Sequence, residues 1–221
     1  HLTIFSYCIL HWSWWCLLIF RKHTKIRLNL WCGSQNKSVN KSNVDLADFS
    51  LDGIFKTTKT EATWFNAIEL KENSILSVGI DYQKDEIDSS KTYAVSSRDN
   101  KAAFLQYKLK SDGADVSFGA RRDDNEQFGA HTTTSVMAGQ DVSDNVRLNF
   151  SYGEGFKAPT FNDLYYPGSG NPNFVPEQSK NIELGLNASW GDSVANMTLF
   201  NNRLENLIQY NFATWTTDQT A

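Results

Sequence analysis

Few residues in this sequence have the type and spacing that covalent or metal chemistry requires. His131 is the only histidine beyond residue 44, so neither a catalytic triad nor a histidine-rich metal site can be assembled there. Cys8, Cys16 and Cys32 lack the C-x-x-C spacing of zinc sites and redox pairs. We therefore predict no enzymatic activity, no catalytic residue and no cofactor.

One acidic cluster has the chemistry of a cation site. Asp123, Asp124 and Glu126 fall in a stretch that we expect to be an external loop, and oxygen-rich loops can bind Ca²⁺. A solvated charged turn explains the same residues more simply. We assign no metal ligand.

The best candidates for contact with a bound molecule lie in the longest predicted loop, residues 155–179. Asn162, Asp163, Tyr165 and Tyr166 combine aromatic surface with polar ends, a mixture suited to holding a large amphipathic ligand. A loop packed over its neighbours explains these residues equally well.

The composition limits the elements that could position such a loop. The chain has 221 residues with 21 Lys+Arg against 25 Asp+Glu, a net charge of −4, which excludes nucleic-acid binding through bulk positive charge. Its 7 Trp, 8 Tyr and 14 Phe are too many for a disordered chain. A mean hydropathy of −0.45 leaves room for one apolar helix at most. A β-rich chain that interleaves apolar and polar residues remains.

Residues 1–44 differ from the rest of the chain. They hold all three cysteines and three of the four histidines, and no acidic residue precedes Asp45. An apolar run over residues 2–20 with basic residues after it predicts a single membrane helix. A wrong start site or shifted reading frame explains the same composition, whereas a secretory signal would carry its charges before the apolar run. We divide the chain into this anomalous basic segment and a β-domain over residues 45–221.

From residue 44 onward the dominant pattern has a period of two, which is typical of strands that separate two environments. In five predicted strands every residue of the first face is apolar, and Phe104 is the one apolar residue of the second face. The five apolar faces begin with Leu76, Ala103, Val116, Val146 and Ile182. Less regular strands are expected near residues 64–70, 130–138 and 194–200.

The connections alternate between short and long. Tight turns are expected at residues 111–113, 141–145 and 191–193, and longer links at 84–100, 122–130 and 155–179. All four prolines lie in the last link. A sheet with short turns at one end of its strands and long loops at the other is typical of an outer-membrane β-barrel.

A soluble β-sandwich binding module shows the same alternation. Aromatic residues at the strand ends and charges in the middle of the polar face favour the barrel. Tyr82, Tyr152 and Trp190 are among the first group, and Asp81 and Arg147 among the second.

Three separate stretches carry a family resemblance, in the right order and spacing: 119–133 (GARRDDNEQFGAHTT), 150–159 (FSYGEGFKAP) and 170–179 (GNPNFVPEQS). Together with Leu204–Ile208 they resemble the barrel of TonB-dependent outer-membrane receptors, and within that family the cobalamin receptors. The resemblance covers residues 60–215.

The resemblance implies an antiparallel up-and-down transmembrane barrel of 22 strands in the bacterial outer membrane, closed around a plug. It also implies a ligand, either cobalamin or, in a siderophore or haem receptor, another metal chelate. The partners implied are outer-membrane lipid and the periplasmic TonB energy-coupling protein, which would act through the plug. This chain can supply about eight strands, so we expect an incomplete barrel, an internal fragment without the plug.

Overall fold

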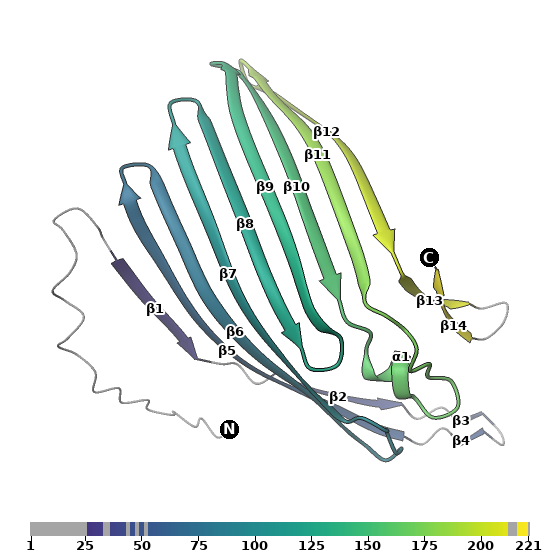
Figure 1. Ribbon diagram of the computed structural model, residues 1–221. Coiled ribbons are helices and arrows are strands. Elements are labelled where there is room, and N and C mark those ends of the chain that lie inside the picture. The colour runs from purple at the N-terminus through teal and green to yellow at the C-terminus, as the bar shows by residue number, and fades with distance from the viewer. Residues whose placement is uncertain are drawn as a thin grey trace, which may run out of the picture.

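The computed structural model describes residues 26–32, 36–42, 45–46, 49–50, 53–211 and 216–220 (Figure 1), with side chains from residue 56 onward. The membrane helix expected over residues 2–20 lies outside the described residues. Within them, no helix is both long and apolar enough to cross a membrane. The boundary at residue 44 stays a prediction.

Eight consecutive strands form one antiparallel sheet in up-and-down order (Figure 1). They are β5 (Gly53–Lys71), β6 (Ser74–Ser89), β7 (Ser97–Ser111), β8 (Ala114–Asn125), β9 (Gly129–Ser143), β10 (Val146–Lys157), β11 (Glu177–Trp190) and β12 (Ser193–Glu205). The expected fold class, a partial antiparallel β-barrel, is confirmed.

Shorter elements flank this sheet. The strands β1 (Ile26–Cys32) and β2 (Asn36–Ser42) both pair with β5. Two small antiparallel hairpins lie outside the sheet. In one, β3 (Asp45–Leu46) pairs with β4 (Phe49–Ser50), and in the other β13 (Leu207–Asn211) pairs with β14 (Thr216–Thr220). The single described helix, α1 (Phe161–Tyr165), interrupts the connection between β10 and β11.

The pairing register gathers the apolar residues of successive strands on one face. In one row across six neighbouring strands, residues stand directly opposite one another: Leu76, Tyr107, Phe118, Val136, Tyr152 and Ile182. Because side chains alternate along a strand, one register fixes the same face for all of these strands. The sequence pattern is thus converted into a continuous apolar surface.

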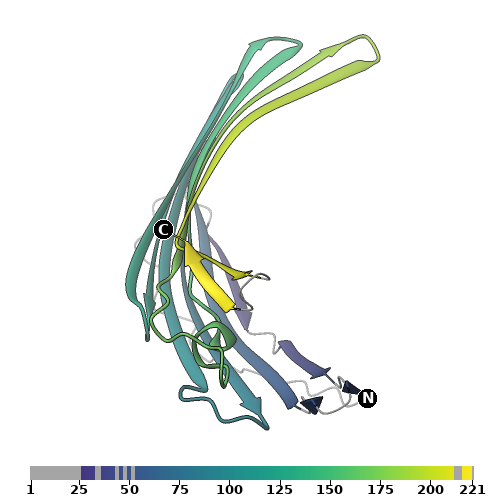
Figure 2. The same ribbon diagram turned by 90° about the vertical axis from the view of Figure 1, so that its right-hand side faces the viewer.

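No second layer covers this surface in the described part of the chain, and Figure 2 shows a single bowed sheet. Leu105, Phe118, Phe150 and Leu186 are 50%, 49%, 39% and 38% exposed. A β-sandwich would bury these side chains between two sheets. An uncovered apolar area of this extent in a folded chain marks an interaction surface.

The two ends of the sheet differ, as expected. Two-residue turns at 72–73, 112–113, 144–145 and 191–192 lie together at the top of Figure 1. Gly113 and Gly191 occupy these turns at φ of 68° and 56°, a conformation that favours glycine. The opposite end carries the connections 90–96, 126–128 and 158–176, and all four prolines lie in the last of these.

The expected long loop at residues 122–130 is wrong. β8 continues to Asn125 and β9 begins at Gly129, so only residues 126–128 turn. The link expected over residues 84–100 is likewise mostly strand, with 90–96 as its connection. The reason is that both faces of these strand ends are polar, so the alternation that marks a strand in sequence disappears while the hydrogen-bonded ladder continues.

Candidate functional site on the concave face

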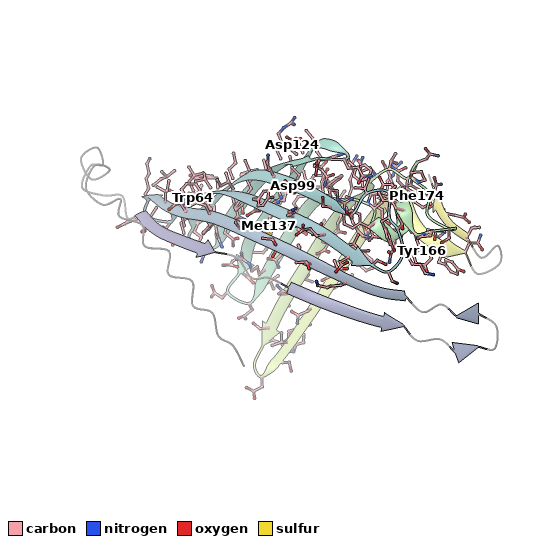
Figure 3. All side chains as sticks on the ribbon, turned by 90° about the horizontal axis from the view of Figure 1, so that it is seen from below. Trp64, Asp99, Asp124, Met137, Tyr166 and Phe174 are labelled. Carbon is pink, nitrogen blue, oxygen red and sulfur yellow. The ribbon has the colours of Figure 1, made fainter. Side chains whose placement is uncertain are left out.

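The polar faces of the strands lie together on the concave side of the sheet. α1 sits on that side in Figure 2, and Met137 projects from it while Asp124 projects from the convex side in Figure 3. The register agrees with this separation. Met137 stands opposite Ser117, which belongs to the polar face of β8, whereas Asp124 lies on the same face of β8 as Phe118 of the apolar row. The convex face is therefore the apolar one, and the concave face is where polar ligands would be met.

Arg121 organises the middle of the concave face. It reaches from β8 to Asp81 of β6, with Nη1 2.5 Å from Oδ2. On its own strand it donates to both carboxylate oxygens of Asp123, from Nε to Oδ2 at 2.9 Å and from Nη2 to Oδ1 at 3.0 Å. Because Asp123 is only 8% exposed, its carboxylate takes its hydrogen bonds from protein groups, two of them from the Arg121 guanidinium.

Phe104, the one apolar residue predicted on the polar face, has a structural role there. Its ring stacks against Phe65, with centroids 6.3 Å apart, and Arg121 lies 5.8 Å above it. Gly79 stands between the two rings, where a Cβ atom would come within 2.3 Å of the Phe104 ring. The Phe104 ring thus makes a cation–π contact with the Arg121 guanidinium, and Phe65 packs against that ring.

A cavity of about 380 Å³ lies between this network and the end of β10. Its walls include charged, amide and aromatic side chains, among them Asp85, Arg98, Asn100, Asn125, Phe156 and Lys157. Asn100 donates to Asp123 at 2.9 Å, and Asn125 accepts from the backbone N–H groups of Gln127 and Phe128. The cavity thus offers fixed donors and acceptors beside an aromatic ring, the usual makeup of a small-molecule site.

Arg98, which lines this cavity, anchors the start of the connection 158–176. Its Nη1 donates to the carbonyl oxygen of Pro159 at 2.9 Å, and its guanidinium lies 5.7 Å and 5.1 Å from the rings of Phe128 and Phe161. Arg98 is 8% exposed. The connection is therefore held by a buried cation, and three of its own apolar side chains, Phe161, Leu164 and Phe174, are also buried.

The four residues proposed from sequence as ligand contacts all lie on or next to α1, beside the cavity and outside its lining. Asn162 is exposed, and its Oδ1 accepts a hydrogen bond from the Tyr93 hydroxyl at 2.6 Å. A tyrosine phenol is ordinarily protonated at neutral pH, and burial raises the pKa of Tyr93 further, so its hydroxyl remains a donor. Tyr165 accepts from Gln127 at 2.5 Å.

Asp163 and Tyr166 mark the two ends of α1. Asp163 forms a capping box with Thr160, accepting from its backbone N–H at 2.8 Å and from its hydroxyl at 2.7 Å. The backbone N–H of Tyr166 donates to the Asn162 carbonyl, and the Tyr166 carbonyl accepts from the backbone N–H of Gly170 at 2.8 Å. The structure thus gives each of the four a local contact, and their role toward a ligand stays a prediction.

The acidic cluster is not brought together. Asp123 and Asp124 are neighbours within β8, so they point to opposite faces, and Glu126 accepts from the backbone N–H of Asp99. Among the described residues, no group of three or more His, Cys, Asp or Glu side chains has the arrangement of a metal site.

Removal of the Arg98 cation is expected to loosen the connection 158–176. In the full-length protein, Arg98→Leu should raise the rate of chymotrypsin cleavage at residues 161–174 roughly tenfold or more, because a hydrogen bond from a charged donor contributes about 1.5–3 kcal/mol. The control is Arg122→Leu, since Arg122 is exposed on the other face and donates to Thr132. Equal cleavage of both variants would contradict this anchoring.

Comparison with known sequences agrees with this architecture. The family model described as TonB dependent receptor-like, beta-barrel matches residues 18–221, which begins earlier than the resemblance read from the motifs. The vitamin B12 transporter BtuB of Photobacterium profundum is 34% identical over 157 residues, 71% of this chain and 25% of the relative. BtuB of Vibrio vulnificus is 32% identical over 158 residues, which make up 70% of this chain and 26% of that relative. The chain thus spans about a quarter of the length of these relatives.

Solved structures show the same fold. The siderophore receptor PirA of Pseudomonas aeruginosa superposes with a TM-score of 0.66 at 20% identity, over 76% of this chain and 37% of that one. The ferric enterobactin receptor PfeA superposes with a TM-score of 0.62 at 16% identity, over 84% of this chain and 33% of that one. The family match, the relatives and the up-and-down sheet together show that this chain belongs to the TonB-dependent receptor β-barrel family, a family of receptors and transporters rather than enzymes.

Proposed function

We propose that this chain forms part of an outer-membrane transporter that binds and imports cobalamin, driven by the periplasmic TonB protein. The identity of 34% over 157 residues to a protein named a vitamin B12 transporter carries the proposal. The bare convex face fits a bilayer, and the polar concave face fits the inside of a barrel. TonB would act through the plug that the family resemblance implies.

A siderophore or haem receptor is the second candidate. The solved structures that share the fold include receptors for ferric siderophores. These structures are only 20% and 16% identical to this chain, so they support the architecture and not the choice of ligand. The more similar BtuB relatives are the better guide to the ligand. Cobalamin is therefore the ligand we favour.

Within this function, we propose Asn162, Asp163, Tyr165 and Tyr166 as ligand contacts. They stand at the looped end of the sheet, on the same side as the polar cavity, where an incoming molecule would first meet the concave face. Tyr166 offers an aromatic ring and Asn162 an exposed amide beside it. Both suit a large ligand with apolar and amide surface.

Equilibrium titration of the full-length protein tests the ligand and the contacts together. Saturable binding of cyanocobalamin is expected, and a ferric siderophore should not displace it. Tyr166→Ala should weaken binding roughly tenfold, because a lost aromatic contact costs about 1 kcal/mol or slightly more. Tyr210→Ala, an exposed tyrosine of β13, is the control. Absence of saturable cobalamin binding would refute the ligand and leave the family unchanged.

A further inference from the structure

The connection between β10 and β11 is held in two different ways along its length. Its larger part, residues 158–171, is anchored by the buried cation Arg98 and receives hydrogen bonds at α1 from Tyr93 and Gln127. The backbone N–H of Asn171 also donates to a carbonyl oxygen of α1, at 2.8 Å. Residues 158–171 therefore form one fastened body around the helix.

The last residues of the connection, 172–176, are held by a side chain from a different element. Gln219 of β14 accepts from the backbone N–H of Val175 at 3.0 Å through Oε1, and its Nε2 donates to the Val175 carbonyl oxygen at 2.6 Å. The side-chain amide thus pairs with both backbone groups of one residue, as the backbone of a neighbouring antiparallel strand would. Nε2 also donates to the carbonyl oxygen of Asn206 at 2.7 Å, which joins the connection to the start of the hairpin β13–β14.

The hairpin that carries Gln219 is itself fixed to the sheet (Figure 1). The backbone N–H of Ile208 in β13 donates to Oε1 of Glu177, the first residue of β11, at 2.8 Å. Oε2 of the same carboxylate accepts from Lys157 of β10 at 2.8 Å, and the Glu177 side chain is 11% exposed. Gln219 therefore reaches residues 172–176 from a fixed support.

The two fastenings differ in strength. Arg98 is a charged donor and 8% exposed, and hydrogen bonds of charged groups are roughly twice as strong as those between neutral groups. The Gln219 amide is neutral and Val175 is 46% exposed, so water competes for the hydrogen bonds between them. Local opening begins where exposed hydrogen bonds hold the backbone. Residues 172–176 should therefore open before the rest of the connection.

We propose that residues 172–176 form a flap, latched by Gln219, that opens while α1 stays in place on the sheet. Pro172 and Pro176 bound the flap, and the fixed φ of each proline confines the movement to the bonds around it. Phe174 is 6% exposed in the latched state, so it is the side chain that opening uncovers. The flap is a conformational device of the looped end and goes beyond the function proposed above.

Electron paramagnetic resonance of a spin label at Asn173→Cys, an exposed position of the flap, tests the latch in the full-length protein with its native cysteines changed to serine. Gln219→Ala should raise the ratio of mobile to immobile label roughly tenfold, because that change corresponds to about the net contribution of one or two neutral hydrogen bonds. Gln219→Glu keeps the size of the side chain and should have at least the same effect. An ionised carboxylate cannot donate to the two carbonyl oxygens that Nε2 contacts.

A label at Ser169→Cys, in the turn that follows α1, is the internal control, and its spectrum should be the same in the parent and in both variants. Gln209→Ala removes an exposed amide from the facing strand β13 and should leave the label at residue 173 unchanged. An unchanged label at residue 173 in both Gln219 variants would overturn the latch. An equal gain of mobility at residues 169 and 173 would overturn the separate opening of the flap. No ligand enters the measurement, so its result is independent of the proposed function.

Discussion

Leu105→Arg is expected to destabilise the folded protein in a lipid bilayer by roughly 2–4 kcal/mol, the cost of a cation near the middle of the hydrocarbon. Leu105 stands in the centre of the apolar stretch of β7, between Val78 and Ala120 of the neighbouring strands, and is half exposed. On a surface that faces water, the same change would cost about 0.5 kcal/mol or less. The size of the effect therefore reports the solvent of the convex face.

Gln106→Arg is the matched control, because residue 106 follows Leu105 on the same strand and faces the concave side. It donates to Ser117 at 3.1 Å, so its replacement should cost about 1 kcal/mol at most. Urea titration of the full-length protein in vesicles, followed by gel mobility, measures both variants. A similar small loss for both would contradict a lipid-facing convex surface.

Arg121→Met, a change on the concave face, is expected to lower the free energy of unfolding by about 2–3 kcal/mol. The change leaves Asp81 and Asp123 without their shared cation, and the Asp123 carboxylate loses two hydrogen bonds while it remains buried. Breaking a fully buried pair costs about 3–5 kcal/mol. We expect less here because the Arg121 side chain is 37% exposed.

Adding Asp123→Asn to Arg121→Met should recover part of the loss, since it removes the uncompensated buried charge. The control is Arg203→Met on β12, where an arginine with a side chain 74% exposed pairs with Glu205. The same urea titration should show a change of about 0.5 kcal/mol or less for that variant. Equal losses for Arg121→Met and the control would refute the network's contribution.

A second arginine shows that this arrangement is repeated along the concave face. Arg147 of β10 forms ion pairs with Asp115 and Asp141, from β8 and β9, near the short turns. Gly139 leaves room for its guanidinium, which a Cβ atom there would displace. Each arginine ties several strands together on the polar side, which complements the ladder of backbone hydrogen bonds.

The apolar alternation predicted the middle of the sheet well. Leu105, Phe118, Phe150 and Leu186 lie on one uncovered face, and the turns at 112–113 and 191–192 fall where glycine and aspartate indicated them. A period of two is local, so it can be read from a single strand. It could not locate the strand ends, because β8 continues to Asn125 through residues that are polar on both faces.

The candidate site was predicted in part. The proline-bounded loop with Asn162 and Tyr165 was identified from its composition. Its anchor was missed, since Arg98 and Pro159 are 61 residues apart and only the pairing of the intervening strands brings them together. Had the alternation been extended past Asn100, Arg98 would have fallen on the concave face beside Asn100.

We expect the convex face to contact hydrocarbon and the concave face to contact water. Single spin labels test it most directly, in the full-length protein with Cys8, Cys16 and Cys32 changed to serine and reconstituted in vesicles. The convex positions are Leu105, Phe118, Phe150 and Leu186, and the concave positions are Gln106, Ser117, Asn149 and Asn187. Labels at the convex positions should be relaxed chiefly by oxygen, which concentrates in lipid, and those at the concave positions by a water-soluble nickel chelate. Similar relaxation of both sets by the nickel chelate would contradict the account.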